Sequence, residues 1–413
     1  MNTNVRIALM LLTASVPTVA GQTNSKKDPS REVFFDATAR QTFYAGPGRQ
    51  EPATDVQEVL IGYFGPDEAS DGRGSDMYRA ASLAIDRANR AGGLNGVPFR
   101  LVPRWSENTW QSGAAEVIRM AYTHKVWAII GGIDGPSTHV AEQVAAKARL
   151  TLLSPGSTDR SVNLANVPWM FSPLPGDHLQ APVLARAIAS YIGDNPFLLV
   201  SSVDHDSHLL TVELGRSLAQ RRLAPCYHFE FRPGQKDYSQ LAEKTVQAGV
   251  RALVLIAAAE DCAQVICTLR EKGFQGLVFG GATMGSRSFL EKAGKAAEGV
   301  IFPLLYTAGK QSDSFEEEFT CRFGNRPDYL AAHTYDSVSL LIAAIRKAGL
   351  NRPRICDAVR ELSPWRGVTG NIRWDSLGSN CRPVGLGTVR AGRVICLSKP
   401  RVPDDAKFRS SRR

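Results

Sequence analysis

Residues 126–160, VWAIIGGIDGPSTHVAEQVAAKARLTLLSPGSTDR, contain two predicted strands, each followed at once by a turn of small residues. The apolar run Val126–Ile130 ends at two glycines, which is typical of a buried parallel strand. Pro136 suits the first turn of a helix, because the amide proton that proline lacks has no partner there. The apolar residues of Val140–Ala148 fall on one helix face, and Thr151–Leu153 is the next strand. The stretch therefore predicts a strand–helix–strand unit of a parallel sheet.

The two turns of this stretch, Asp134–Thr138 and Gly156–Thr158, leave the carboxyl ends of neighbouring strands. Ligands of open α/β sheets bind at that edge. Both turns contain hydroxyl side chains beside glycines, so that backbone N–H groups are able to approach an anionic or carbonyl group. Neither turn has a nucleophile with a base beside it. The pattern indicates a binding site rather than a catalytic one.

The length of the chain, 413 residues, favours two domains over a single hydrophobic core. Strands and helices alternate from about residue 57, and the alternation restarts after residue 175, which predicts two doubly wound α/β lobes. The helices expected after residue 306 and the short strands expected after residue 363 do not fit a simple tandem. We therefore expect 58–175 and 307–363 in lobe 1, 176–306 and 364–398 in lobe 2, and a hinge where the chain crosses between them.

The beginning of the chain has the features of an export signal. Residues 1–21 contain one Arg, a short apolar run and then small residues, and the run is too short to span a bilayer as a helix. No cysteine lies near the expected cleavage site, so no lipid anchor is implied. Residues 22–57 have little periodicity and are expected to form an extended leader, with Phe34, Phe35 and Tyr44 docking locally.

The net charge of +9 does not indicate a nucleic-acid partner. Residues 399–413 carry six Lys or Arg against two Asp, and residues 1–54 carry six against four Asp or Glu, which leaves +3 for 55–398. A nucleic-acid-binding protein concentrates its basic residues on a folded face. Residues 399–413 are therefore expected to be a solvated basic tail.

All seven cysteines lie in the second half of the chain, at 226, 262, 267, 321, 356, 381 and 396. Export to an oxidising compartment favours disulfides. Cys381 and Cys396 flank a predicted β-hairpin, so they are the preferred pair. Zinc binding by cysteines is disfavoured, because the chain has no C-x-x-C motif and its histidines are scattered.

Several segments together resemble the type 1 periplasmic solute-binding proteins of branched-chain amino-acid ABC transporters. They are IGYFGP, LAIDRANRAGGLNGVPFRLV, IIGGIDGPST, LLSPGSTD, KDYSQLAEKTVQAGVRALVL, AAEGVIF, HTYDSVSLLIAAI and VTGNIRWDSLG. The resemblance covers about residues 57–398. It implies two Rossmann-like lobes joined by a three-crossover hinge, a small ligand enclosed between them, a periplasmic location, an ABC permease as partner and no cofactor.

The resemblance also implies which residues bind the ligand. In the family the turns at Asp134–Thr138 and Gly156–Thr158 hold the carboxylate of an amino acid, and here Gly135 stands where a serine is favoured. The acidic residue that pairs with the ammonium group aligns near Ala282, and the expected aromatic falls among Ala257–Ala259. A buried ammonium without a counter-charge is costly, so the pattern disfavours free leucine unless another carboxylate replaces the missing one. The expected ligand-binding residues are Phe64, Trp105, Asp134, Gly135, Ser137, Gly156, Ser157, Thr158, Asp206, Ala258, Glu260 and Thr283, with Asp206 or Glu260 as the alternative counter-charge.

Two further features admit more than one interpretation. The polar segment Ser201–His208 follows a predicted strand and is expected to be a loop that faces the cleft. Its D-H-D run with a second His suits a metal, but hydrogen bonding to water, backbone or ligand is favoured, and no metal site is predicted. Phe64 and Trp105 end strands of lobe 1 and either stack on the ligand or pack in the core. Tyr335 and Asp336 are expected to be structural, near the hinge.

Three classes of function are consistent with such a fold. The favoured one is a periplasmic binder that delivers a small polar or amphipathic solute to an ABC permease by hinge closure. The alternative is a soluble ligand sensor that acts on a receptor partner. An enzyme is disfavoured, because the chain lacks G-x-S-x-G, H-E-x-x-H and P-loop motifs, and YFGP (63–66) stands where a dinucleotide site needs glycines.

Overall fold

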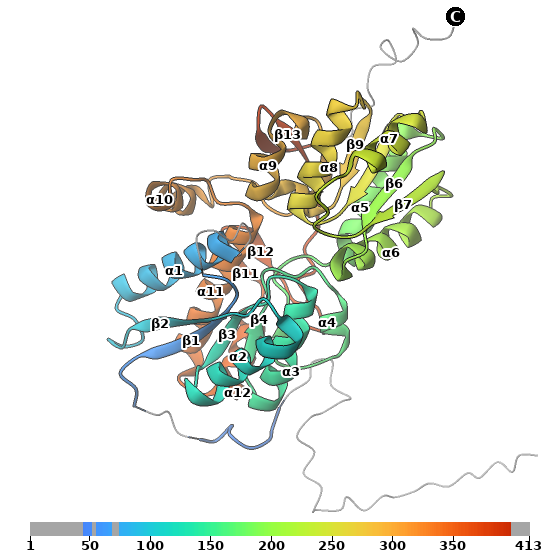
Figure 1. Cartoon of the computed structure of the whole chain (residues 1–413). Helices are drawn as coiled ribbons and strands as arrows, with labels where there is room; N and C mark the ends of the chain where they lie inside the picture. The colour runs from blue at the N-terminus through green and yellow to red at the C-terminus, as the bar shows by residue number, and fades with distance from the viewer. Residues whose placement is uncertain (1–43, 52–54, 68–73, 398–413) are drawn as a thin grey trace, which may run out of the picture.

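The computed structural model describes residues 44–51, 55–67 and 74–397, which form two α/β lobes joined by a hinge (Figure 1). The predicted export signal and basic tail lie outside the described residues. Within the described residues, no helix combines the length and the apolar character that a bilayer crossing requires. The doubly wound α/β class predicted from the sequence is confirmed.

Lobe 1 is built on a five-stranded parallel sheet of order β2-β1-β3-β4-β5. Its strands are β1 (Val59–Phe64), β2 (Phe99–Arg104), β3 (Ala128–Gly131), β4 (Thr151–Leu153) and β5 (Met170–Phe171). Its helices are α1 (Gly74–Arg90), α2 (Ala114–Ile118) between π-helical turns at Thr109–Gly113 and Arg119–Thr123, α3 (Gly135–Ala148), α4 (Ser161–Leu164), α10 (Asp313–Phe323), α11 (Tyr329–Ala348) and α12 (Arg352–Glu361).

Both faces of this sheet are buried, because successive side chains of a strand point to opposite faces. Ala128 and Ile130 of β3 pack with α1, α11 and α12 on one face. Ile129, between them, packs with α2 and α3 on the other. This explains why β1, β3 and β4, in the middle of the sheet, are almost wholly apolar, as expected of parallel strands covered by helices on both sides.

Lobe 2 contains a seven-stranded sheet of order β14-β13-β10-β9-β8-β6-β7, in which β13 and β14 are antiparallel to their neighbours. Its strands are β6 (Leu198–Ser202), β7 (Tyr227–Phe231), β8 (Ala252–Ile256), β9 (Leu277–Gly280), β10 (Ile301–Leu304), β13 (Gly385–Arg390) and β14 (Arg393–Cys396). Its helices are α5 (Asp177–Ile192), α6 (His205–Ala219), α7 (Ser239–Gln247), α8 (Ala259–Glu271) and α9 (Arg287–Ala293), with 3₁₀ turns at Ala282–Gly285 and Gly294–Ala297. Helices α5 and α6 cover one face, and α7, α8 and α9 the other.

The chain crosses between the lobes three times: after β5, after β10 and before β13. Two crossings are hydrogen-bonded to each other, because Ser172 N donates to Gly378 O and Asn380 N donates to Ser172 O, both at 2.9 Å. The half-buried guanidinium of Arg382 donates to the carbonyls of Leu305 and Thr369 and so connects the second and third crossings. The hinge is thus a set of mutually bonded segments rather than a flexible tether.

A small hairpin of β11 (Trp365–Gly367) and β12 (Gly370–Ile372) precedes the third crossing and is held by Asp336 of α11. The Asp336 carboxylate accepts from Val368 N at 2.7 Å, from Thr369 N at 2.8 Å and from Thr369 Oγ1 at 2.7 Å. Burial raises the pKa of Asp336 to about 6 in spite of these donors. The structural role expected for Asp336 agrees with these contacts.

The structure corrects the prediction of a loop at Ser201–His208. Ser201 and Ser202 belong to β6, and α6 already begins at His205. The reason is a helix cap: the side chain of Asp204 accepts from Ser207 N at 3.0 Å, which satisfies one of the first N–H groups of the helix. His205 and Asp206 therefore lie on a rigid first turn.

The end of the leader docks on lobe 1. Tyr44 is buried, with its ring 5.2 Å from that of Trp169, and Asn351 at the start of α12 donates to Gly48 O at 2.9 Å. Phe34 and Phe35 lie outside the described residues. The predicted Cys381–Cys396 disulfide is wrong, and all seven cysteines are free. The backbone N–H of Cys381 donates to Arg373 O ahead of the hairpin, whereas Cys396 lies within the hairpin.

Candidate functional site

A cavity of about 100 Å³ lies between the lobes, at the carboxyl ends of the parallel strands of both sheets. Lobe 1 contributes the turns after β3 and β4 and the start of α11, and lobe 2 contributes the segments after β6, β8 and β9. The lining residues are Ile133, Gly156, Thr158, Tyr329 and Leu330 from lobe 1, and Gln180, Asp204, Asp206, Ser207, Leu210, Ile256–Ala258 and Gly281–Thr283 from lobe 2. Ligands of open α/β sheets bind at this edge.

The first turn of lobe 1 uses its side chains to cap α3. Asp134 accepts from Ser137 N at 2.9 Å, and Ser137 Oγ accepts in return from Asp134 N at 3.3 Å, which is a capping box. Thr138 Oγ1 donates to Asp134 O at 2.7 Å. The side chains of Asp134 and Ser137 are therefore occupied within their own turn. Neither residue lines the cavity.

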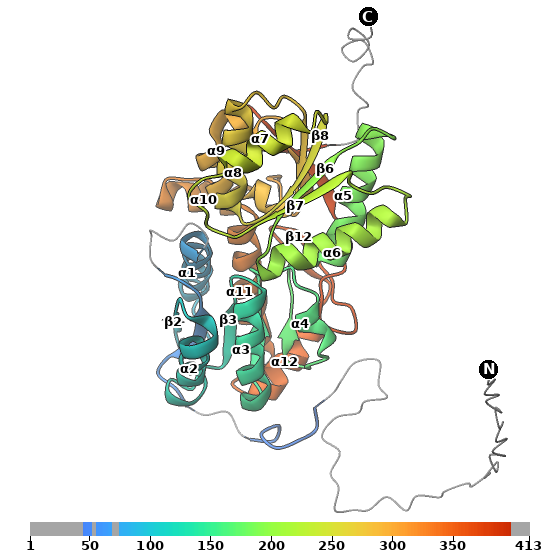
Figure 2. The same cartoon turned by 45° about the vertical axis from the view of Figure 1, so that its right-hand side comes forward.

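The backbone of the same turn contacts lobe 2 directly. Gly135 N lies 3.1 Å from both carboxylate oxygens of Asp206 in α6. Burial, and secondarily the charge of Asp134, raise the pKa of Asp206 to about 6, against the Gly135 N–H bond, which lowers it. In Figure 2 the first turn of α6 approaches the top of α3 and α4, where this contact connects the two lobes.

The second turn of lobe 1 is more open to the cavity. Gly156 and Thr158 line it, whereas Ser157 is buried and its hydroxyl accepts from Asp159 N at 3.2 Å. Asp177, at the start of α5, is fully buried beside Thr158, and burial raises the pKa of this carboxyl group well above its ordinary value. The cleft thus combines a small-residue turn on one lobe with acidic side chains around it.

In lobe 2 the structure separates the two alternative counter-charges. Asp206 lines the cavity, whereas Glu260 in α8 does not, and its carboxylate is drawn outward to Lys292 at 3.6 Å. Ala258 and Thr283 line the cavity, and Thr283 Oγ1 donates to Ala257 O at 3.0 Å. Small residues at 257, 258 and 282 leave space where the sequence comparison expected an aromatic and an acid.

Phe64 is a core residue rather than a ligand contact. Its side chain is fully buried, its ring lies 5.2 Å from that of Trp105, and it packs among the residues of α2 and α3. Trp105 is partly buried, and its indole Nε1 donates to Glu107 at 3.1 Å. Neither aromatic lines the cavity between the lobes. Phe64 packs on the face of the sheet that α2 and α3 cover.

Sequence reasoning missed a cluster at the edge of the cleft. His205 Nε2 in lobe 2 lies 2.9 Å from Asp159 Oδ2 in lobe 1, and His139 Nε2 of α3 lies 3.1 Å from the same oxygen. His139 and Asp159 directly follow the two turns that the sequence did identify, at 134–138 and 156–158. This position in the sequence could have predicted the cluster, since two turns at the same edge of a sheet bring the residues that follow them close together.

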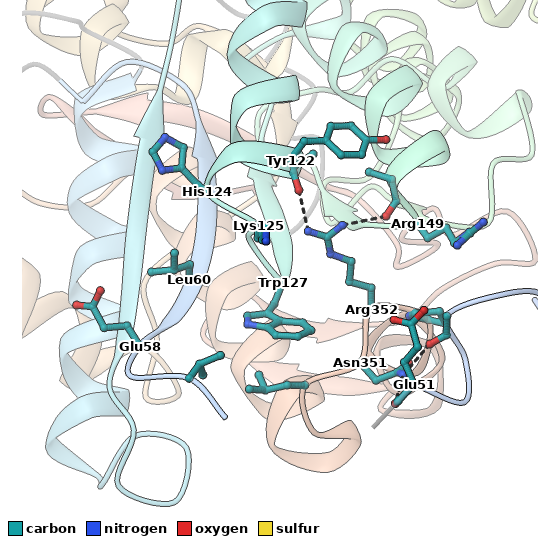
Figure 3. Close-up of a pocket in the computed structure, with 16 residues that line it drawn as sticks. Glu51, Glu58, Leu60, Tyr122, His124, Lys125, Trp127, Arg149, Asn351 and Arg352 are labelled. Atoms are coloured by element: carbon teal, nitrogen blue, oxygen red, sulfur yellow. Dashed lines mark hydrogen bonds between the residues drawn. The ribbon is translucent and has the colours of Figure 1, made fainter. Parts of the chain in front are cut away.

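A larger cavity, of about 560 Å³, lies at the opposite end of the sheet of lobe 1 (Figure 3). The docked leader, the segment before β3 and the start of α12 line it. The guanidinium of Arg352 donates to the carbonyls of Ala121, Val126 and Ala148 at 2.8–3.3 Å, and burial lowers its pKa. These bonds join backbone segments, so the residues here anchor α12 and the leader rather than converge on a ligand.

Two α/β lobes with a cavity at their facing sheet edges and a bonded three-crossing hinge define the class of two-lobed solute-binding proteins. Residues 58–393 match the model of a family described as "Periplasmic binding protein". The chain belongs to this family.

Curated relatives and solved structures agree with this assignment. The chain is 21% identical to the leucine-, isoleucine-, valine-, threonine- and alanine-binding protein of Pseudomonas aeruginosa, over 78% of this chain and 86% of that protein. It is 23% identical to a Leu/Ile/Val-binding protein homolog of Brucella melitensis, over 74% and 82%. A branched-chain amino acid transporter substrate-binding protein from Streptococcus pneumoniae, in complex with isoleucine, shares the fold with a TM-score of 0.76 at 20% identity, over 82% of this chain and 100% of that chain.

The same fold also occurs with another ligand. A solute-binding protein of an ABC transporter from R. palustris, in complex with benzoate, has a TM-score of 0.75 at 13% identity, over 82% of this chain and 95% of that chain. The two TM-scores are almost equal although the ligands differ. Fold similarity therefore does not select a ligand, and the ligand class has to be inferred from the residues of the cleft.

Proposed function

We propose that this protein is the periplasmic solute-binding component of an ABC-type importer. It binds a small solute that carries an ammonium group, such as an amino acid, between its lobes by hinge closure. The observation that carries this proposal is the cavity itself, in which Gly156 and Thr158 of one lobe face Asp204 and Asp206 of the other.

The charge of the lining supports a solute with an ammonium group. Among the described residues that line the cavity, Asp204 and Asp206 are the only charged ones, and neither Lys nor Arg is present. Asp206 is held by a single N–H group of Gly135, so its carboxylate retains acceptor capacity. Its raised pKa shows that burial of the negative charge is only partly compensated, and an ammonium group would supply the missing compensation.

The way the cavity is shared supports hinge closure. Each lobe supplies only part of the lining, so a solute makes its full set of contacts only when the lobes are together. A ligand that binds the closed form better shifts the population toward it, and the permease is then able to recognise that form.

The test compares three related solutes: an amino acid, the amine without its carboxylate and the acid without its amine. Binding is measured by isothermal titration calorimetry and compaction by small-angle X-ray scattering. The amino acid and the amine should bind and compact the protein, and the acid should bind at least tenfold more weakly.

Two variants separate the alternative counter-charges. Asp206→Asn should weaken binding of the amino acid by about 30-fold or more, since truncating one partner of a buried charge pair costs roughly 2–5 kcal/mol. Glu260→Gln is the matched control and should bind as the unaltered protein does, because its carboxylate faces Lys292. If a panel of amino acids and amines gives no binding with compaction, or if Asp206→Asn binds equally well, the proposal is wrong.

A further inference from the structure

Three side chains with metal-binding atoms meet at the edge of the cleft, and they come from both lobes. His139 lies in the first turns of α3 and Asp159 in the segment after β4, while His205 is the first residue of α6. The two imidazole Nε2 atoms lie 3.1 Å and 2.9 Å from Asp159 Oδ2. All three potential donor atoms lie within 4.8 Å of one another.

These separations are close to those around a tetrahedral ion. Zinc bonds to histidine nitrogen and carboxylate oxygen are about 2.0–2.2 Å long, so neighbouring donor atoms lie about 3.3 Å apart. The observed nitrogen–oxygen distances are a few tenths of an ångström shorter, as hydrogen bonds to the carboxylate would make them. A small outward shift of the imidazoles therefore places an ion between the three side chains.

The surroundings orient the donor atoms in the way that metal sites require. Asp159 Oδ1 accepts from Ser161 N at 2.7 Å, which leaves Oδ2 directed at both imidazoles. On the far side of His139, Nδ1 lies 3.6 Å from a carboxylate oxygen of Glu142. Glu142 is buried at 4% exposure, and its Oε1 has no hydrogen-bond partner among the described residues. A carboxylate behind a ligating histidine fixes the ring and strengthens the ligand.

We propose that His139, Asp159 and His205 form a binding site for a divalent transition metal of the zinc class that bridges the two lobes. Two imidazoles and one carboxylate suit zinc and its neighbours, whereas magnesium and calcium prefer oxygen ligands. Three protein ligands leave a fourth position for water. His205 is about 40% exposed, which gives an ion access from solvent.

Because the metal site bridges the two lobes, metal binding should change the population of the closed form. His139 and Asp159 belong to lobe 1 and His205 to lobe 2, so the complete site exists only when the lobes are closed. Zinc therefore favours the closed form and acts in the same direction as the solute. This inference goes beyond the solute-binding function and is tested without any solute.

Protons compete with the metal for this site. Donation of hydrogen bonds to Asp159, and secondarily to Glu142, raises the pKa of His139 to about 9. Against the effect of burial, the hydrogen bonds that Asp159 accepts keep the pKa of its carboxyl group well below its ordinary value. His139 must lose its proton before it binds a metal. Asp206 and Asp177 are further charged or titratable groups near the cluster.

The experiment measures Zn²⁺ binding to the metal-stripped full chain by competition with a chromophoric chelator. His205→Gln and His139→Gln should each weaken binding at least tenfold, and Glu142→Gln should weaken it by about 10- to 100-fold. His208→Gln is the matched control, since His208 is exposed on the same helix and outside the cluster, and it should bind as the unaltered protein does. Circular dichroism and melting temperature establish that each variant is folded.

Two further measurements test the character of the site. Zn²⁺ alone should reduce the radius of gyration, and His205→Gln should abolish this compaction. Co²⁺ in place of zinc should show a spectrum without thiolate charge-transfer bands, because exposed cysteines such as Cys226 and Cys321 are the competing ligands. Equal affinities of both histidine variants and the unaltered protein, thiolate bands, or binding without compaction would each overturn the proposal.

Discussion

Replacing Gly135 by alanine should keep the lobes from closing without harming the fold. A Cβ atom built at this position lies 2.4 Å from Asp206 Oδ1, 2.9 Å from His205 Cδ2 and 3.0 Å from Asp159 Oδ2. Two of these three atoms belong to lobe 2. Ordinary contacts begin at 3.4 Å, so the Asp206 carboxylate has to retreat by about 1 Å.

This retreat breaks the contact between Gly135 N and the two oxygens of Asp206, now 3.1 Å long. Hydrogen bonds to charged groups contribute roughly 1.5–3 kcal/mol. Solute affinity should therefore fall about 10- to 150-fold, since every 1.4 kcal/mol corresponds to a factor of ten. The fold should not suffer, because Gly135 starts a helix with an ordinary backbone conformation and alanine favours helices.

The assay compares Gly135→Ala with Gly215→Ala in calorimetry, solution scattering and thermal melting. Gly215 lies in α6, and a Cβ there meets nothing within 4 Å, so its replacement should leave affinity and compaction unchanged. Gly135→Ala should melt at or above the temperature of the unaltered protein, yet remain extended when solute is added. Affinity and compaction within twofold of the unaltered protein would refute the view that this contact defines the closed form.

Three other predictions concern pH, the hinge and the leader. Closure of the ligand-free protein should strengthen as the pH falls from 8 to 4, by up to roughly 3 kcal/mol, because burial raises the pKa of Asp206 to about 6 in the closed form and thereby penalises its charged state. Solution scattering should show this compaction, and Asp206→Asn should abolish the part of the compaction that depends on Asp206. Asp134, Asp159 and His205 are the other groups that face this carboxylate. Asp336→Ala should destabilise the fold by about 1–3 kcal/mol, seen as a lower melting temperature, because it leaves three donors of the hinge hairpin without their acceptor. Tyr44→Ala should cost on the order of 3 kcal/mol of stability without changing solute affinity, because its ring packs on Trp169 far from the cleft; chemical denaturation and calorimetry measure the two quantities, and a loss of affinity would contradict the assignment.

The fold was predictable because its signals are local and repeated. Apolar runs such as Val126–Ile130 and glycine-rich turns recur along the chain, and each predicts a strand and its carboxyl end independently of the others. The start of α6 was not recognised, because Asp204 and Ser207 resemble loop residues until the Asp204 carboxylate caps the helix. Residues that cap helices and residues that bind ligands are the same polar types, so composition does not distinguish them.

The candidate site was predictable only in part, for a related reason. Gly156, Thr158 and Asp206 line the cavity as their positions after strands suggest. Phe64 also ends a strand, but its side chain points to a covered face of the sheet, and the sequence does not contain that orientation in advance. The cluster of His139 with its partners requires the contact between lobes, which no local pattern encodes.

The two lobes contribute different groups to the cleft, because each turn satisfies its own polar groups in a different way. On lobe 1 the capping box consumes the side chains of Asp134 and Ser137, so that turn offers mainly backbone at Gly135 to its surroundings. On lobe 2 the cap uses Asp204 alone, which leaves the carboxylate of Asp206 directed into the cleft. Backbone groups of the turn at Gly135 in lobe 1 therefore face side chains of the first turn of α6 in lobe 2. It follows that substitutions in the first turn of α6 should alter which solute is bound, whereas substitutions in the capping box should chiefly alter stability.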